Sequence, residues 1–164
     1  MSPRPQRIDE PVREIPLSLS IGALSVLHRR VFSEHLRGES WITDAGLRPG
    51  CYGVLSSIDA LQPASQAEIS ADRGLDPSDV VGIVDILEKA GFVARDRDTV
   101  DRRKYSLTLT AAGETALARL NVVADKVQDV IFGPLNARDR ASFERLLQRL
   151  VDHHADIGRT SKRT

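Results

Sequence analysis

The spacing of apolar residues along the chain predicts a mainly helical protein. From residue 16 to 37 they recur with a helical period, for example at Ile21, Leu24 and Val31. The same kind of spacing predicts further helices over residues 51–61, 66–74, 77–90, 111–132 and 137–157. Residues 38–49 end at the turn signal Arg48–Pro49–Gly50 and are expected to form a loop.

Two of the predicted helices are short and lie close together in the sequence. Ser65 precedes Glu68 by three residues, a capping-box spacing that predicts the start of a helix. Gly74 ends this helix, and Asp76–Pro77 starts the next one as N-cap and first helical residue. The pair is typical of a helix-turn-helix, although an ordinary helical hairpin has the same pattern. In the second helix the expected buried residues are Val80, Val81, Val84, Ile86 and Leu87.

Two predicted strands follow at once, over residues 92–95 and 104–110, and a charged loop joins them. The five cations of this stretch are Arg95, Arg97, Arg102, Arg103 and Lys104, against three aspartates. A helix-turn-helix followed by a β-hairpin with a basic tip is a winged helix. We therefore predict a mainly α fold with a small β-wing, in which N- and C-terminal helices flank a winged helix-turn-helix and form a dimer.

This pattern divides the chain into five parts. Residues 1–15, with three prolines, are expected to be a flexible arm, and residues 16–49 an N-terminal dimerisation helix and loop. Residues 50–110 form the expected DNA-binding region, residues 111–157 the C-terminal dimerisation helices, and residues 158–164 a basic tail.

Composition narrows the possible classes of protein. No apolar run approaches the ~20 residues that a membrane span needs, and the N-terminus lacks the apolar core of a secretory signal. A cytoplasmic protein is therefore expected. The single cysteine, Cys51, excludes an internal disulfide and a cysteine zinc site. No catalytic Ser/His/Asp set, phosphate loop or metal-ligand spacing is visible, so we expect neither an enzyme nor a cofactor or metal.

Charge alone does not indicate nucleic-acid binding, because 23 Lys and Arg balance 23 Asp and Glu. Phosphate contacts need positive charge in one place, and the predicted wing supplies it.

Spaced residues in the second half of the chain resemble the MarR (multiple antibiotic resistance regulator) family. They are Val80, Gly82, Leu87–Glu88, Gly91–Phe92–Val93, Asp101–Arg102–Arg103, Thr110 and Gly113. Asp79 departs from the small or weakly polar residue usual in that family. The resemblance implies a homodimer with interlocked terminal helices that binds pseudo-palindromic operators. Many members release DNA when a small, often aromatic, acid binds, and some sense thiol oxidation or zinc.

The expected contacts to double-stranded DNA come from the helix-turn-helix and the wing. Arg103 is the strongest candidate and Arg97 the next, because an arginine at a wing tip can enter a narrow minor groove. The alternative is a merely solvated run of charges. The second short helix exposes no arginine or glutamine, so specificity is expected to depend on shape and the wing. The full set of candidates is Ser65, Gln66, Pro77, Ser78, Asp79, Gly82, Arg95, Arg97, Arg102, Arg103 and Lys104.

An effector site is expected to involve His28, Trp41, Arg48 and Tyr52, although plain packing explains these residues equally well. The sequence therefore favours a homodimeric transcription repressor that a small effector, such as an aromatic acid, releases from its operator. Two alternatives stay open: a DNA-binding dimer without a ligand, and a regulator that senses thiol oxidation through Cys51. For Cys51 itself, a buried small hydrophobic residue is the simpler interpretation.

Overall fold

The computed structural model describes residues 15–97 and 105–161, and their side chains as far as residue 153. The elements in chain order are α1 (Leu17–Arg37), α2 (Ser40–Asp44), α3 (Pro49–Leu61), α4 (Gln66–Arg73), α5 (Pro77–Lys89), β1 (Val93–Arg97), β2 (Tyr105–Leu109), α6 (Ala111–Phe132) and α7 (Ala137–Ser161). The predicted fold class, mainly helical with a two-stranded wing, is confirmed.

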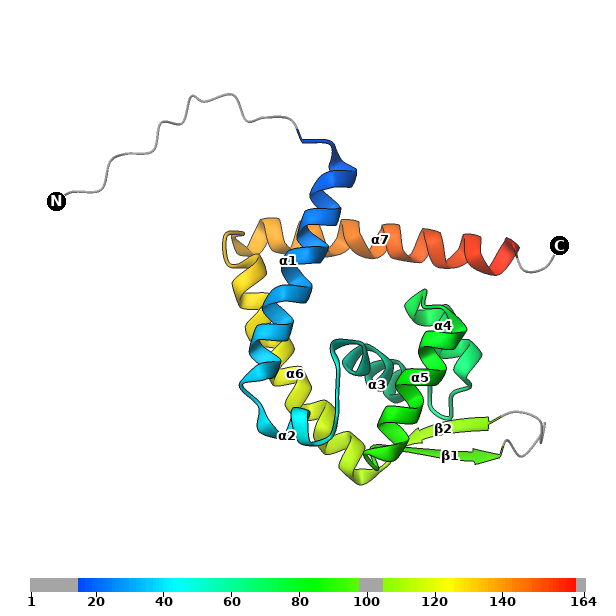
Figure 1. Ribbon diagram of the computed structural model, residues 1–164. Coiled ribbons are helices and arrows are strands. Elements are labelled where there is room, and N and C mark those ends of the chain that lie inside the picture. The colour runs from blue at the N-terminus through cyan, green and yellow to red at the C-terminus, as the bar shows by residue number, and fades with distance from the viewer. Residues whose placement is uncertain (1–14, 98–104, 162–164) are drawn as a thin grey trace, which may run out of the picture.

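The long helices frame a compact group of short elements. Figure 1 shows α1 crossing α6 and α7 on one side of the molecule, while α3, α4, α5 and the two strands gather on the other. We call this group, residues 49–109, the head. Helices α1 and α6 pack against each other, and α3 packs against α4, α5, α6 and β2. The terminal helices thus support the head through α3 and α6.

The core of the head lies where α3, α4 and α5 meet. Leu55, Ile58 and Ile69 have no exposed surface, and neither do Val80, Val84, Leu87 and Leu107. Burial of each such side chain stabilises the fold by about 1.5–3 kcal/mol relative to exposure. Residues of α1 and α6, such as Phe32 and Leu120, continue the same core.

Side-chain caps fix several helix starts, of which three belong to the head and the helix that follows it. Ser65 and Glu68 form the predicted capping box at α4, in which each side chain bonds the other's backbone N–H. Asp76 caps α5 by accepting a 2.8 Å bond from the N–H of Ser78. Thr110 accepts a bond from Gly113 and donates its hydroxyl to the carbonyl of Gly91, at 2.7 Å. This last cap ties α6 to the turn between α5 and β1.

The two strands form an antiparallel ribbon in which Val93 pairs with Leu109 and Arg97 with Tyr105. The segment before α4 joins this ribbon. Ala64 and Leu107 exchange backbone hydrogen bonds of 3.0 and 2.8 Å, and the side chain of Gln62 accepts a bond from Leu109. The wing is therefore connected to both ends of the helix-turn-helix.

The structure corrects the sequence prediction at several places. The short helix α2 lies within the segment predicted as a loop. In α5, Val81 is 41% exposed and Ile86 only half-buried, and Ile83 occupies the core instead. Helix α3 begins at Pro49, not at residue 51, and α7 extends to Ser161.

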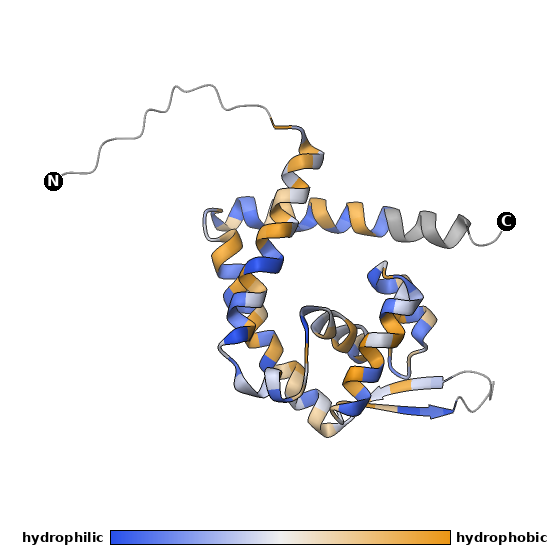
Figure 2. Cartoon of the chain, in the orientation of Figure 1, coloured by the Kyte–Doolittle hydropathy of each residue, from blue (hydrophilic) through white to orange (hydrophobic). Residues whose placement is uncertain are grey.

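The terminal helices carry apolar residues that the single chain leaves uncovered. On α1 they include Leu17, Leu19, Ile21 and Val26, and on α7 Leu146, Leu147, Leu150 and Val151, all at least 47% exposed. Figure 2 shows these hydrophobic stretches along both helices. No helix in the described part of the chain is both long and apolar enough to cross a membrane.

Candidate nucleic-acid interface

Helices α4 and α5 form the helix-turn-helix that the sequence predicts. Gly74 adopts a left-handed conformation (φ 61°) at the end of α4, a conformation that glycine accepts without steric cost. The turn is held by Ser70, whose hydroxyl donates to the carbonyl of Leu75 at 2.7 Å. This tight turn fixes the angle at which α5 leaves α4, and α5 occupies the position of a recognition helix.

The start and outer side of α5 expose small and polar residues. Pro77, Ser78 and Asp79 are exposed in the first turn, and Gly82 is half-buried. The hydroxyl of Ser78 donates to Asp76 at 2.5 Å, and this bond together with the Ser78 N–H lowers the pKa of the Asp76 carboxyl. Val81 adds an exposed apolar side chain, which can contact the methyl group of thymine in a major groove.

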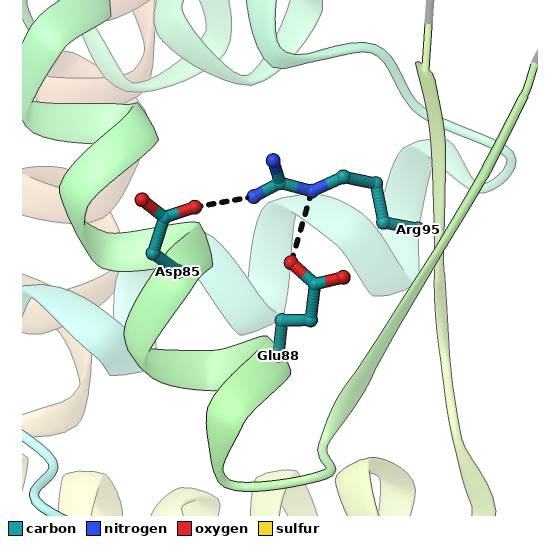
Figure 3. A network of polar contacts seen from close by, with 3 residues as sticks. All are labelled: Asp85, Glu88 and Arg95. Atoms are coloured by element: carbon teal, nitrogen blue, oxygen red, sulfur yellow. Dashed lines mark hydrogen bonds and ion pairs between the residues drawn. The ribbon is translucent and has the colours of Figure 1, made fainter.

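Arg95 on β1 is bound to α5. Its guanidinium lies 2.6 Å from Asp85 and 3.1 Å from Glu88, and only 20% of its side chain is exposed. Figure 3 shows Arg95 reaching across to both acids. The same guanidinium lies 5.8 Å from the centre of the Tyr105 ring. In this arrangement Arg95 offsets two acidic groups of α5 and attaches the wing to that helix, and its predicted contact with DNA stays a prediction.

Of the other predicted wing cations, the structure describes only Arg97. Arg97 is exposed at the end of β1. Arg102, Arg103 and Lys104, with Asp101, lie outside the described residues. Their DNA contacts stay a prediction.

At the start of α4, one of the two residues predicted to hold phosphate is engaged by the protein. The hydroxyl of Ser65 donates to Glu68 at 2.7 Å. The side-chain nitrogen of Gln66 is buried, without a hydrogen-bond partner among the described residues. The structure thus shows the capping box that was predicted here, and a phosphate contact stays a prediction.

The four predicted effector residues fall into three separate environments. The rings of His28 and Tyr52 both stack on Phe32, with centroids 5.9 and 5.5 Å from it. The Tyr52 hydroxyl donates to Asn121 on α6 at 3.1 Å. Burial raises the pKa of this hydroxyl, and nearby Asp125 raises it further. His28 and Tyr52 therefore belong to one ring stack between α1, α3 and α6.

Trp41 belongs to a second cluster, one that the sequence did not indicate. Its indole N–H donates to Glu39 at 3.0 Å, and the guanidinium of Arg119 lies over its ring at 4.2 Å. Arg119 also lies 3.6 Å from Glu39. This cluster attaches α2 to α6, and α2 itself was missed because its five residues are too few for a period.

Arg48 and Cys51 stand at the start of α3. Arg48 is exposed, and its guanidinium lies beside Gly82 on α5 rather than in either aromatic cluster. Cys51 is only 1% exposed, and burial raises the pKa of its thiol. A buried thiol with a raised pKa has little of the reactive thiolate form, which weakens the redox interpretation.

Comparison with known proteins agrees with this geometry. The model of the MarR family matches residues 49–105, which include the helix-turn-helix and most of the wing. A protein described as a transcriptional regulator for the hcr operon of Thauera aromatica is 33% identical over 108 residues, 66% of this chain and 65% of that protein. The transcriptional repressor NicR of Pseudomonas putida is 31% identical over 58% of this chain and 61% of its own length. The chain thus matches somewhat less than two thirds of each of these relatives.

Solved structures share the fold at lower identity. A crystal structure of MarR superposes with a TM-score of 0.76 at 22% identity, covering 90% of this chain and 97% of that one. Bordetella bronchiseptica BpsR, whose DNA binding is regulated by 6-hydroxynicotinic acid, gives 0.71 at 23% identity, covering 91% and 99%. A variant of Escherichia coli MarR complexed with operator DNA gives 0.69 at 21%, covering 83% and 94%. These likenesses establish the winged-helix fold with its terminal helices.

Proposed function

We propose that this chain, which belongs to the MarR family of winged helix-turn-helix transcription regulators, binds operator DNA as a homodimer and represses transcription. The observation that carries the proposal is the joint presentation of α5 and the wing. Helix α5 exposes Ser78, Asp79 and Val81, and in the wing Arg97 is exposed at the end of β1. A recognition helix in the major groove with a basic wing beside it is an established way to bind duplex DNA.

The proposed dimer uses the uncovered apolar residues of the terminal helices. Residues 16–49 and 111–157 would form the dimerisation part, and residues 50–110 the DNA-binding part. The exposed leucines and valines of α1 and α7 form large apolar surfaces, which soluble proteins usually cover with a partner. A two-fold dimer presents two heads to operator half-sites about 10 bp apart.

The proposed effector is a small aromatic acid. DNA binding by BpsR is regulated by such an acid, and the relative NicR is named a repressor. In this chain the His28–Phe32–Tyr52 stack offers aromatic faces next to the Asn121 amide. A ligand can lower DNA affinity only if it binds the DNA-incompetent arrangement more tightly than the competent one.

A mobility-shift titration on the DNA flanking its own gene tests this function. We expect a shift at nanomolar to micromolar protein that weakens about 5- to 150-fold with the correct acid, the usual range of such coupling. The variants Tyr52→Phe and His28→Ala should blunt this response and leave ligand-free binding nearly intact. No shift with any flanking fragment would contradict DNA binding. A shift that no aromatic acid changes would favour the ligand-independent dimer. As an operator-binding protein, it would act in the cytoplasm.

A further inference from the structure

The recognition helix has an acidic excess where DNA would lie. Along α5 the charged residues are Asp79, Asp85, Glu88 and Lys89, and the helix contains no arginine. Arg95 offsets Asp85 and Glu88, as Figure 3 shows, but Asp79 makes no ion pair within the described part of the chain. Positive charge favours the approach of a helix to the phosphates of DNA, and α5 itself provides only Lys89.

A second arginine from outside α5 reaches this helix. A β-carbon built on Gly82 would lie 3.5 Å from Nη2 of Arg48, so the guanidinium lies against α5 where Gly82 has no side chain. Gly82 is one turn before Asp85 on the same side of the helix, a side that the core residues Val80 and Val84 do not share. Arg48 is exposed and makes no ion pair with any described residue.

The position of Arg48 is fixed by the start of α3. Arg48 is the N-cap residue of α3, and its carbonyl accepts a 2.9 Å bond from the Cys51 N–H. In the first turn of α3, a β-carbon on Gly50 would lie 3.0 Å from Ile83, so the two helices approach closely because residue 50 is glycine. Cys51 beside it is buried in the core. The backbone that carries Arg48 is therefore anchored against α5.

We propose that Arg48 reads a guanine base in the operator and supplies the arginine that α5 lacks. This inference rests on the proposed function, because it assigns a base contact within the same DNA interface. A guanidinium can donate two hydrogen bonds to O6 and N7 of guanine in the major groove, the commonest specific contact of this kind. Gly82 has no side chain to fill this space. Arg48, at the start of α3, can therefore take the place of an arginine on α5.

The test compares Arg48→Ala with Arg138→Ala, which removes an exposed cation at the start of α7, away from the head. Binding is measured by mobility shift on a fragment that the wild-type protein binds and on an unrelated fragment of equal length. Arg48→Ala should lose about 5- to 150-fold in affinity for the operator fragment, the range of one bidentate base contact, and much less for unrelated DNA. Arg48→Lys, which keeps the charge, should also lose discrimination. Thermal unfolding of each variant checks that the fold is intact.

A rescue variant makes the position itself testable. Gly82→Arg placed in the Arg48→Ala background returns a guanidinium to the same space and should restore part of the discrimination. The proposal is overturned if Arg48→Ala binds like Arg138→Ala, or if it loses affinity equally on both fragments, as a phosphate contact would. It is also overturned if the rescue variant discriminates no better than Arg48→Ala. Wild-type protein that binds no DNA would instead contradict the proposed function.

Discussion

Arg95 on β1 lies 2.6 Å from Asp85 on α5, and this pair joins the first strand of the wing to the recognition helix. A cation in a wing is commonly assumed to face DNA. Here the neighbouring Arg97 is exposed while Arg95 faces the protein. Two arginines only two positions apart therefore have different surroundings, since alternate residues on one side of a strand need not share a partner.

We predict that Arg95→Ala weakens DNA binding more than it weakens the fold. The acids it contacts are 59% and 44% exposed, so the ion pairs should contribute only about 1 kcal/mol or less to stability. Loss of the attachment lets the end of the ribbon at Arg97 shift relative to α5, which should lower operator affinity severalfold. Arg140→Ala, which breaks the Arg140–Glu144 pair on α7, is the matched control. Equal DNA affinity in the two variants would refute the positioning role.

For the wing cations, we predict that Arg97→Ala lowers affinity for all DNA sequences alike. Each lost phosphate contact should reduce the slope of log affinity against log salt by about one unit. Arg103→Ala, outside the described residues, should act more strongly. Titrations at several salt concentrations measure the slope. An unchanged slope and affinity in both variants would show that the wing does not contact DNA.

Substitution of Gly113 should destabilise the protein. A β-carbon there would clash with the carbonyl of Phe92, which accepts a hydrogen bond from Thr110. We expect Gly113→Ala to lower the free energy of unfolding by about 1–3 kcal/mol or more, because a buried site has no room to relax. Gly22→Ala, in the interior of α1 with nothing within 4 Å, should instead raise it by about 0.5–1 kcal/mol. Urea denaturation of both variants gives the comparison.

Substitutions on α7 test the proposed dimer. Leu150 is 53% exposed among other uncovered apolar residues, and a lysine there would place a charge in the proposed interface. We predict that Leu150→Lys sediments as a monomer at micromolar concentration and binds DNA far more weakly. Gln148→Lys adds the same charge at a polar position two residues away and should remain dimeric. A wild-type protein that sediments as a monomer would contradict the dimer itself.

Cys51 should react slowly with alkylating reagents. Its pKa is raised by burial, so at pH 8 less of the thiol is deprotonated than in an unfolded chain, and access is blocked as well. We expect the thiolate to accumulate only at a pH above the ordinary range for cysteine. Labelling by iodoacetamide with and without urea measures both effects. Rapid labelling of the folded protein, with loss of DNA binding on mild oxidation, would restore the redox alternative.

Local sequence signals predicted the head well. Ser65–Glu68, Asp76–Pro77 and Thr110 mark helix starts by hydrogen bonds within a few residues, so their outcome depends little on the rest of the fold. Within α5 the apolar period was ambiguous. Val80, Val81, Ile83 and Val84 are all β-branched, and packing against α3 decides that Ile83 is buried and Val81 exposed.

The candidate site was harder to predict because it depends on contacts between distant residues. Nothing near Arg95 in the sequence shows that Asp85 and Glu88 will accept its guanidinium. Arg48 and Trp41 were predicted to share an effector site, yet Arg48 lies against α5 and Trp41 against Arg119. Sequence patterns identify the residue types that can act, and the tertiary fold decides which of them meet.

The paired backbone hydrogen bonds between Ala64 and Leu107 bear on how such a protein could be switched. Through these bonds the segment before α4 pairs with β2. The wing therefore cannot move relative to the start of α4 without breaking a hydrogen bond. We expect the head to move as one rigid body. An effector would then act by changing the distance between the two heads of a dimer. Affinity for an operator depends on that distance, because the spacing of its half-sites is fixed.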